Sequence, residues 1–283
     1  MIERVGIVGG GLMGAGIAEV NARNGLDTVV VEVSPQAAGA ARDRVRRSLD
    51  AALSRGKVSR EERDAAEGRI RFDTDLGALA DRDLVIEATT EDETVKLRVF
   101  AEVDRILGGG AVLASNTSSI PIVKLGSVTR FPSRVLGVHF FNPVPVMRLV
   151  ELVPSLTTGA ETLARMRRYV TAQLGKEAIQ ATDRAGFVVN SLLVPYLLSA
   201  IRMYEAGYAS IEDVDRGMVL GCGHPMGPLA LADLIGLDTL RAIGNSLYSE
   251  FKEPLYSPPP LLDRMVEAGL VGTKSGHGFH THH

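Results

Sequence analysis

Short apolar runs alternate with longer amphipathic segments along residues 1–181. The runs are rich in Val and Ile and mostly continuous, which is typical of strands buried on both faces of a sheet, and the segments between them have helical spacing. This alternation predicts an α/β fold with a doubly wound, mainly parallel sheet. The expected strands are "RVGIVG", "DTVVVEV", "DLVIEAT", "AVLASN", "RVLGVHFF", "LVELV" and "KEAIQAT", and the expected helices are 12–24, 35–56, 60–68, 92–107 and 160–174.

The pattern changes after "DRAG" at residues 183–186. From Phe187 onward the spacing predicts helices and turns without a convincing strand, punctuated by "GCGHPMGPL" and "YSPPPLL". We therefore expect two domains, an α/β domain at 1–183 and an all-helical domain at 184–283. Within the first domain, Ser59 and Glu62 form a capping-box pattern that predicts the start of its third helix.

A glycine-rich turn joins the first strand to the first helix in "VGIVGGGLMGAGIAEV". Gly9, Gly11 and Gly14 form the pattern G-x-G-x-x-G, which indicates dinucleotide binding when it follows a strand and opens a helix. The three glycines would serve the tight turn, the approach of a pyrophosphate and helix–strand packing, in that order. The first helical residues, Leu12 and Met13, would present unpaired N–H groups to the phosphates. The motif predicts a Rossmann-type domain.

An acidic residue ends the second expected strand. Glu32 stands 23 residues after Gly9, where a carboxylate accepts hydrogen bonds from the adenosine ribose and repels a 2′-phosphate. We therefore expect NAD rather than NADP as the cofactor. Ser34 and Arg42 lie close in sequence and leave tolerance of NADP open.

Two ionisable residues interrupt the apolar stretch "RVLGVHFFNPVPVMRLVELV". His139 and Glu151 are equidistant from Pro145, so a chain reversal there would place them face to face on adjacent strands. A buried carboxylate is costly unless it is paired, and an imidazole beside it would satisfy both groups. A lone His in a strand is more often a core residue, so the hypothesis depends on Glu151. The pair predicts a general base for alcohol oxidation beside a nicotinamide.

Composition narrows the possible partners and location. With 45% apolar residues, 23% charged residues and a net charge of −3, nothing favours nucleic acid or an anionic membrane as a partner. The stretch "GFVVNSLLVPYLLSAI" contains polar residues and Pro195, and it is shorter than the roughly 20 residues of a membrane span. A single cysteine, Cys222, and an immediate first strand without room for a signal peptide indicate the cytoplasm.

A series of motifs along nearly the whole chain resembles the 3-hydroxyacyl-CoA dehydrogenases. The motifs are "GGGLMGAGIA", "VIEATTEDETVK", "LASNTSSIPI", "HFFNPVPVMRLVELV", "DRAGFVVNSLLVPYL" and "PMGPLALADLIGLDT". The stretch "HFFNP" with a Glu twelve residues after its His is the most specific of them. The chain is most similar to the short bacterial members of the family that act on 3-hydroxybutyryl-CoA.

The resemblance implies NAD-dependent interconversion of (S)-3-hydroxyacyl-CoA and 3-oxoacyl-CoA thioesters. It also implies a Rossmann NAD domain followed by a helical dimerisation and substrate domain, and hence a homodimer. His139 would be the base and Glu151 its partner. The remaining implied contacts are Ser118 and Asn190 with the reacting oxygen, Asn142 with the His and the substrate, and Ala88, Glu91, Lys96 and Asn116 with the cofactor. Taken singly, Ser118 fits a cap, Asn142 a turn and Lys96 a surface position.

Cations gather between residues 42 and 63, which hold eight Lys/Arg against four Asp/Glu, a local net charge of +4. CoA carries a pyrophosphate and a 3′-phosphate, so its site needs local positive charge. The resemblance places the CoA-contacting arm here, with Ser48, Arg55 and Lys57 as the favoured contacts. For any one of these cations, a solvated helix face is an equally good interpretation.

The C-terminal segment "GHGFHTHH" departs from the family, which ends in glycine, phenylalanine and tyrosine. His280 replaces the aromatic hydroxyl, which puts any role of that tyrosine in doubt. His277, His280, His282 and His283 could imitate a metal cluster, but no acid or Cys ligand accompanies them. We expect either a frayed tail or residues that are foreign to the natural protein, and no metal.

Two other functions remain open at this point. The motif "GGGLMG" also resembles dehydrogenases of the 3-hydroxyisobutyrate and 6-phosphogluconate type, which use a lysine as acid and base and lack the "HFFNP…E" pairing. A second alternative is a non-catalytic, cofactor-binding structural protein, because lens λ-crystallin resembles the same family. The acyl chain length, the direction of the reaction and the pathway are also open.

Overall fold

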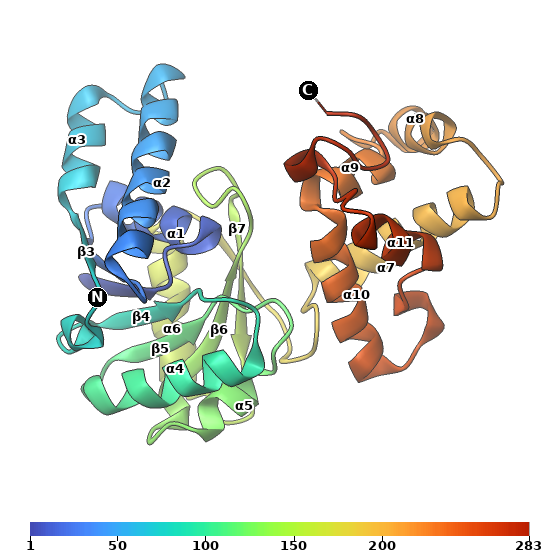
Figure 1. Cartoon of the computed structure of the whole chain (residues 1–283). Helices are drawn as coiled ribbons and strands as arrows, with labels where there is room; N and C mark the ends of the chain where they lie inside the picture. Colours follow the sequence, from blue (N-terminus) through green and yellow to red (C-terminus); the bar gives the residue numbers. More distant parts are fainter. Residues whose placement is uncertain (283) are drawn as a thin grey trace. The chain divides into compact units, whose positions relative to one another are not determined.

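The computed structural model describes residues 1–282 and contains two compact units, Met1–Asp183 and Arg184–His283 (Figure 1). The first unit is built on eight strands: β1 (Arg4–Val8), β2 (Asp27–Val31), β3 (Ile70–Asp73), β4 (Leu84–Glu87), β5 (Val112–Ser115), β6 (Val135–Phe140), β7 (Leu149–Pro154) and β8 (Glu177–Gln180).

These strands form one sheet in the order β3-β2-β1-β4-β5-β6-β7-β8. Every neighbouring pair is parallel except β6 and β7, which are antiparallel. The chain first moves outward from β1 to β3 and then resumes with β4 on the other side of β1. In doubly wound sheets such a reversal leaves a crevice at the carboxyl ends of the two strands involved, here β1 and β4, and ligands bind there.

Helices connect the strands of the first unit: α1 (Leu12–Arg23), α2 (Pro35–Ser54), α3 (Arg60–Gly68), η1 (Leu76–Leu79), α4 (Glu93–Ile106), α5 (Ile122–Ser127), η2 (Pro132–Arg134), α6 (Ala160–Arg168) and η3 (Tyr169–Gln173). The capping box at α3 is present, with Ser59 Oγ accepting from the Glu62 amide and the Glu62 carboxylate accepting from the Ser59 amide. Helices α2 and α3 form an arm that projects from the sheet (Figure 1).

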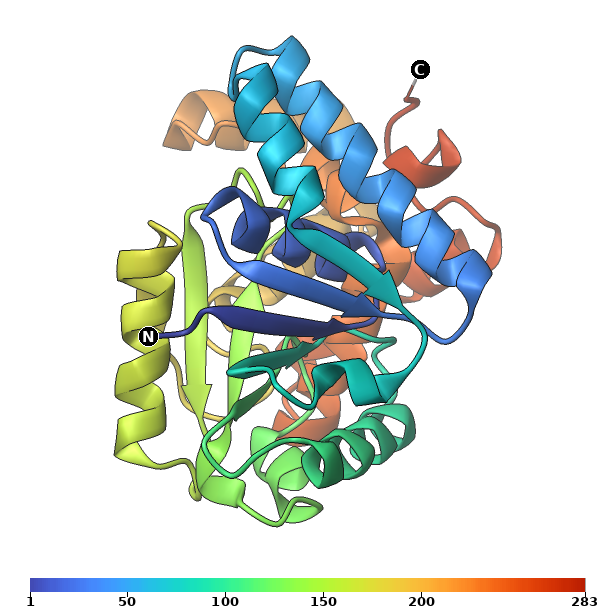
Figure 2. The ribbon, with the colours of Figure 1, turned by 90° about the vertical axis from the view of Figure 1, so that its left-hand side faces the viewer.

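The main hydrophobic core lies between the sheet and the helices α1 and α6 with η3. Ile17 of α1 and Tyr169 of η3 are fully buried there with alternate residues of the central strands. The Tyr169 hydroxyl donates to Asn21 Oδ1 at 2.7 Å, which satisfies its polar atom inside the core. Helix α6 runs beside β7 (Figure 2).

The expected α/β architecture is confirmed, and all of the expected strands and helices of this unit are present. One strand was missed. The segment "IRFD" forms β3 at the edge of the sheet, where its residues are half-buried or exposed. An edge strand lacks the continuous apolar run by which buried strands are recognised in a sequence.

The second unit consists of helices around its own core, and its described residues contain no strand longer than an isolated bridge. Fully buried residues of that core include Leu197, Leu229 and Leu240. No helix among the described residues combines the length and apolar character needed to cross a bilayer. The elements are α7 (Val189–Glu205), α8 (Ile211–Cys222), α9 (Pro228–Ile235), α10 (Leu237–Phe251), η4 (Pro254–Tyr256), α11 (Pro260–Glu267) and η5 (Thr273–Ser275).

The expectation of a frayed C-terminal tail is wrong for residues 277–282. Two buried carboxylates hold this segment: Asp233 of α9 accepts from the amides of Phe279 and His280 at 2.9 and 2.8 Å. His280 Nε2 lies 2.8 Å from Asp215, and His282 Nε2 lies 3.0 Å from Asp233. The acidic partners of these histidines, which the sequence near the tail lacks, are on α8 and α9. Within residues 1–282 no group of three or more His, Cys, Asp or Glu could hold a metal, and His283 lies outside the described residues.

Candidate active site

The glycine loop after β1 has the geometry of a phosphate cradle. Gly9 has φ of +93°, and a Cβ added there would lie 2.9 Å from the Ala88 carbonyl oxygen. A Cβ on Gly14 would lie 1.8 Å from the Gly9 carbonyl oxygen, so only glycine allows this helix–strand contact. No atom lies within 4 Å of a Cβ placed on Gly11. The loop is therefore closed on its protein side and open at Gly11, where a pyrophosphate would approach.

The N-terminus of α1 continues this open side. Gly11 provides no side-chain cap, and the first turn contains no acid. Leu12 is 67% exposed and Met13 is half-buried. The first amides of α1 therefore remain available to an anion, and these residues fit the pyrophosphate of NAD.

Glu32 lies just beyond β2 and contacts the same loop. Its Oε1 accepts from the Gly10 amide at 2.6 Å, and its Oε2 accepts from the Val33 amide at 3.2 Å. Gly10 was not singled out in the sequence, yet a Cβ there would lie 2.4 Å from the Ala41 Cβ. The carboxylate is thus held at the carboxyl end of β2 beside the glycine loop, where an adenosine ribose would be bound.

His139 and Glu151 lie directly opposite each other in the antiparallel register of β6 and β7. His139 Nδ1 is 2.7 Å from Glu151 Oε2, and the two residues are 7% and 0% exposed. The Phe141 ring packs edge-on against the imidazole at a centroid distance of 4.6 Å. The tertiary structure therefore pairs the His139 imidazole with the Glu151 carboxylate, as the sequence predicts.

The strand alternation explains which side of the sheet carries this pair. Leu136 and Val138 of β6 point into the core beneath α1 and α6, so His139 points to the opposite face. On that face Gly137 approaches Ile122 of α5, since an added Cβ would lie 2.9 Å from the Ile122 side chain. His139 therefore lies on the face of the sheet against which α5 packs, near the carboxyl end of β6.

The loop after β5 is organised by Glu91. Its Oε1 accepts from the amides of Ser118 and Ser119 at 3.0 and 3.1 Å and from Thr117 Oγ1 at 2.5 Å. Burial raises the pKa of the Glu91 carboxyl, but the nearby Lys96 ammonium and these donors outweigh it and hold the pKa below its ordinary value. Glu91 therefore remains ionised and fixes the backbone on which Ser118 is presented.

Lys96 is buried, not on the surface, with 1% of its area exposed. Its ammonium lies 2.7 Å from Glu87 Oε1, and the Ser115 hydroxyl donates to Glu87 Oε2 at 2.6 Å. Glu87 also accepts from the Thr89 amide and hydroxyl, each at 2.6 Å. Glu87 was missed in the sequence, although an acid at the end of the apolar strand "LVIE" is the same signal that drew attention to Glu151.

Two further residues lie at the same edge of the sheet. Asn116 Oδ1 accepts from the Phe140 amide at 2.9 Å, which ties the loop after β5 to the strand that carries His139. Asn142 is exposed in the loop after β6, and its peptide bond to Pro143 is cis. The loops that begin at Gly9, Ala88 and Asn116 all follow parallel strands, so they meet where the topology places the crevice.

The remaining expected residues lie elsewhere. Asn190 occupies the first turn of α7 in the second unit. Ser48 is half-buried on α2, and Arg55 and Lys57 are exposed at the turn between α2 and α3. The arm thus carries all three of the residues expected to contact CoA.

Comparisons with family models cover almost the whole chain. Residues 4–184 match the model of the 3-hydroxyacyl-CoA dehydrogenase NAD binding domain. Residues 186–282 match the model of the C-terminal domain of the same family.

Individual proteins give the same result. The chain is 58% identical over 282 residues to a 3-hydroxybutyryl-CoA dehydrogenase of Mycobacterium tuberculosis, with 99% of each chain covered. Among solved structures, FadB2 of M. tuberculosis matches with a TM-score of 0.99 and 57% identity, covering 100% of this chain and 99% of that one. The (S)-3-hydroxybutyryl-CoA dehydrogenase PaaH1 of Ralstonia eutropha matches with a TM-score of 0.94 and 44% identity over 100% of both chains.

Proposed function

Because the chain belongs to the 3-hydroxyacyl-CoA dehydrogenase family, we propose that it interconverts (S)-3-hydroxyacyl-CoA and 3-oxoacyl-CoA thioesters with NAD. Short substrates, 3-hydroxybutyryl-CoA and acetoacetyl-CoA, are the proposed pair, because the relative that is 58% identical is a 3-hydroxybutyryl-CoA dehydrogenase. The observation that carries the proposal is the buried His139–Glu151 pair beside the edge of a nucleotide-binding sheet.

The pairing defines which imidazole nitrogen can act. An ionised Glu151 carboxylate can only accept a hydrogen bond, so His139 Nδ1 carries the hydrogen that it donates to Oε2 at 2.7 Å. Nε2, the other ring nitrogen, would accept the proton of the substrate C3 hydroxyl when the substrate is bound. As the imidazole becomes cationic, Glu151 stabilises it. The pair thus performs general base catalysis in oxidation and general acid catalysis in reduction.

Other residues would position the two reactants. NAD, when bound, accepts the hydride from C3. The Gly9–Gly14 loop and Glu32 would hold its pyrophosphate and adenosine ribose, with Ala88, Glu91, Lys96 and Asn116 around the nicotinamide half. Ser118 and Asn190 would donate to the C3 oxygen, and Asn142 would hold the substrate near His139. In this proposal Glu91 acts mainly as a positioning residue, because it fixes the Ser118 backbone.

The direct test is the absorbance of reduced nicotinamide at 340 nm after acetoacetyl-CoA is added. We expect oxidation of NADH that depends on the thioester, and a panel of thioesters from short to long acyl chains would give the preferred length. A purified, folded protein that leaves NADH unchanged with every member of the panel would favour the non-catalytic, crystallin-like alternative.

Replacing Glu32 with Ala should narrow the preference for NAD over NADP. The substitution removes an acceptor for the ribose hydroxyls and a negative charge that repels a 2′-phosphate. The measurement is kcat/KM with each cofactor for both proteins. A wild-type enzyme that works better with NADP would show that Glu32 does not have this role.

Replacing Arg55 with Ala should raise KM for the CoA thioester more than KM for NAD. An exposed charge-assisted contact with a phosphate is worth up to about tenfold in affinity. Arg60 is the matched control, since it is exposed on the same arm near Arg55. Equal effects of Arg55→Ala on both KM values, or an equal effect of Arg60→Ala, would remove Arg55 from the CoA site.

We also propose a symmetric homodimer formed through residues 186–283, located in the cytoplasm. The second unit exposes several large apolar side chains, and a domain of this size gains stability by burying such surface against a partner. These side chains are Leu192, Met203, Tyr208, Leu220 and Leu234. Light scattering at micromolar concentration should give twice the mass of the chain, and a monomeric mass would contradict the proposal.

A further inference from the structure

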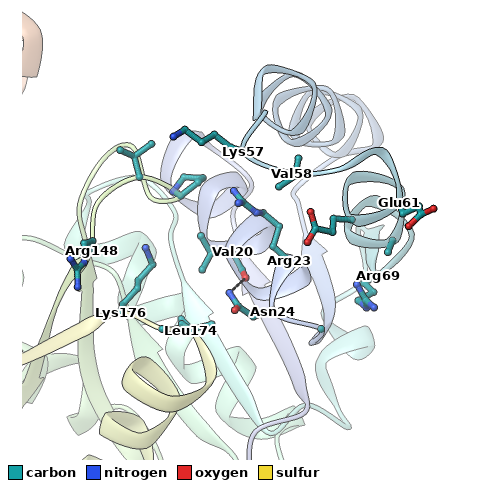
Figure 3. A pocket seen from close by; sticks show the side chains of 16 residues that line it. Val20, Arg23, Asn24, Lys57, Val58, Glu61, Arg69, Arg148, Leu174 and Lys176 are labelled. Carbon is teal, nitrogen blue, oxygen red and sulfur yellow. Dashed lines mark hydrogen bonds between the residues drawn. The ribbon is translucent and has the colours of Figure 1, made fainter. Parts of the chain in front are cut away.

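The first unit contains a cavity of about 800 Å³ to which His139, Glu151 and the glycine loop contribute no lining residue. Its lining comes from the C-terminal half of α1, the turn between α2 and α3, α3 itself, the tip of the β6–β7 hairpin and the segment before β8 (Figure 3). These segments are far apart in sequence, so the cavity is a product of the tertiary fold.

Positive charge dominates the lining. Five cationic side chains line the cavity against two carboxylates, Glu61 and Glu62: Arg23, Lys57, Arg69, Arg148 and Lys176. The Glu62 carboxylate is engaged at the start of α3, where it accepts from the Ser59 amide at 2.7 Å. In Figure 3 the Glu61 carboxylate points away from Arg23 and Lys176. Within residues 1–282 the lining cations that form ion pairs are Arg23 and Arg148, and their partners are Glu19 and Glu177 rather than Glu61 or Glu62.

Lys176 and Arg23 are the two cations of the lining that are not exposed, and we refer to them as the floor of the cavity. Lys176 is nine-tenths buried, and its ammonium donates to the carbonyl oxygens of Val144 and Met147 at 2.8 and 2.6 Å. Two neutral carbonyls leave its charge uncompensated and one of its three N–H donors uncommitted. Burial, and then repulsion by the Arg23 guanidinium, lower the pKa of Lys176 below its ordinary value. The Arg23 guanidinium lies 3.3 Å from the buried Glu19 carboxylate, which compensates part of its charge. Lys176 has no carboxylate partner within residues 1–282, so a bound anion would stabilise its ammonium.

The remaining cations surround this floor. Lys57 makes no ion pair within residues 1–282, and its nitrogen lies on the same side of the cavity as those of Arg23 and Lys176 (Figure 3). Arg148 contacts Glu177 at 3.4 Å, but both side chains are mostly exposed, so the pair is weak and exchangeable.

We propose that this cavity is a phosphate-binding site that takes a pyrophosphate or phosphomonoester group. Arg23 and Lys176 bind the anion at the floor, and Lys57 and Arg148 bind it from the rim. The CoA part of the substrate carries both kinds of phosphate, and a separate phosphate-bearing regulator would carry the same chemistry. The site itself does not depend on the proposed activity; only its assignment to CoA rests on it.

The experiment is calorimetric titration of the full chain with inorganic pyrophosphate and with adenosine 3′,5′-bisphosphate at low salt. The test variant is Lys57→Gln with Arg148→Gln, which removes two exposed rim charges without touching the core. A second variant, Glu19→Gln with Arg23→Gln, removes a floor cation together with the buried acid that lies 3.3 Å from it. Arg60→Gln is the matched control, since Arg60 is exposed on α3 but does not line the cavity.

We expect each double variant to bind pyrophosphate roughly tenfold more weakly, with Arg60→Gln unchanged. If KM for acetoacetyl-CoA rises in parallel while KM for acetoacetyl-N-acetylcysteamine, which lacks phosphates, stays constant, the anion belongs to CoA. If pyrophosphate binding falls and both KM values stay constant, the site serves a separate anion. Wild-type protein that does not bind pyrophosphate at millimolar concentration, or double variants that bind it as wild type does, would overturn the proposal. Because binding is measured without turnover, a failure here is distinct from a failure of the dehydrogenase activity.

Discussion

His139→Gln should lower kcat for the oxidation of 3-hydroxybutyryl-CoA by about 10²–10⁴-fold, the usual range for loss of a general base. Gln has no group that takes a proton at neutral pH, and in the proposed mechanism the other residues of the site only orient the reactants. NAD affinity should stay nearly unchanged, because the Gly9–Gly14 loop is untouched. The measurements are steady-state kinetics and a binding titration with NAD.

The outcome that would remove His139 from catalysis is a folded variant with wild-type kcat. A large loss of NAD affinity would also contradict this role, because it would mean that the substitution disturbs the nucleotide crevice. A thermal unfolding curve close to that of the wild type is the control. It separates lost chemistry from lost structure, since His139 is buried and paired.

Glu151→Gln should lower kcat by a comparable or smaller factor, within about 10²–10⁴-fold. The amide keeps the shape of the carboxylate and can still accept from His139 Nδ1, but it lacks the charge that stabilises the imidazolium. The stabilisation is lost in the transition state, so the effect appears in kcat. A purely structural acid would instead show its loss mainly in the unfolding midpoint, because Glu151 is fully buried.

Two measurements distinguish a catalytic role of Glu151 from a purely structural one. The combined variant His139→Gln/Glu151→Gln should lose less than the product of the single losses, because the two residues act as one unit. The pH profile of kcat for oxidation should show an ionisation of the pair that is missing in both single variants. A folded Glu151→Gln protein with wild-type kcat and an unaltered pH profile would rule out a catalytic role for the carboxylate.

Some parts of the candidate site could be predicted from the sequence, and others could not. The glycine loop was recognisable because it is a local motif whose meaning depends only on the strand before it and the helix after it. The His139–Glu151 contact was accessible because a hairpin relates residues by simple symmetry about its turn, here Pro145. The burial of Lys96 against Glu87 could not be predicted from the sequence. A lysine on a helix gives the same sequence pattern whether its side chain faces solvent or a buried carboxylate.

The sequence by itself predicted the alternation of strands and helices, the nucleotide loop and the pairing of His139 with Glu151, because hydrophobic period and short motifs act within one element or between neighbours. Tertiary structure alone decided the contacts between distant segments. Glu91 reaches the Ser118 amide 27 residues away, and His280 meets Asp215 across 65 residues. The cavity that Lys176 lines together with residues of α1 and α3 is of the same kind. In each case the sequence pattern around a charged residue does not reveal its partner. The partner depends on which chain segments the packing of the core brings together.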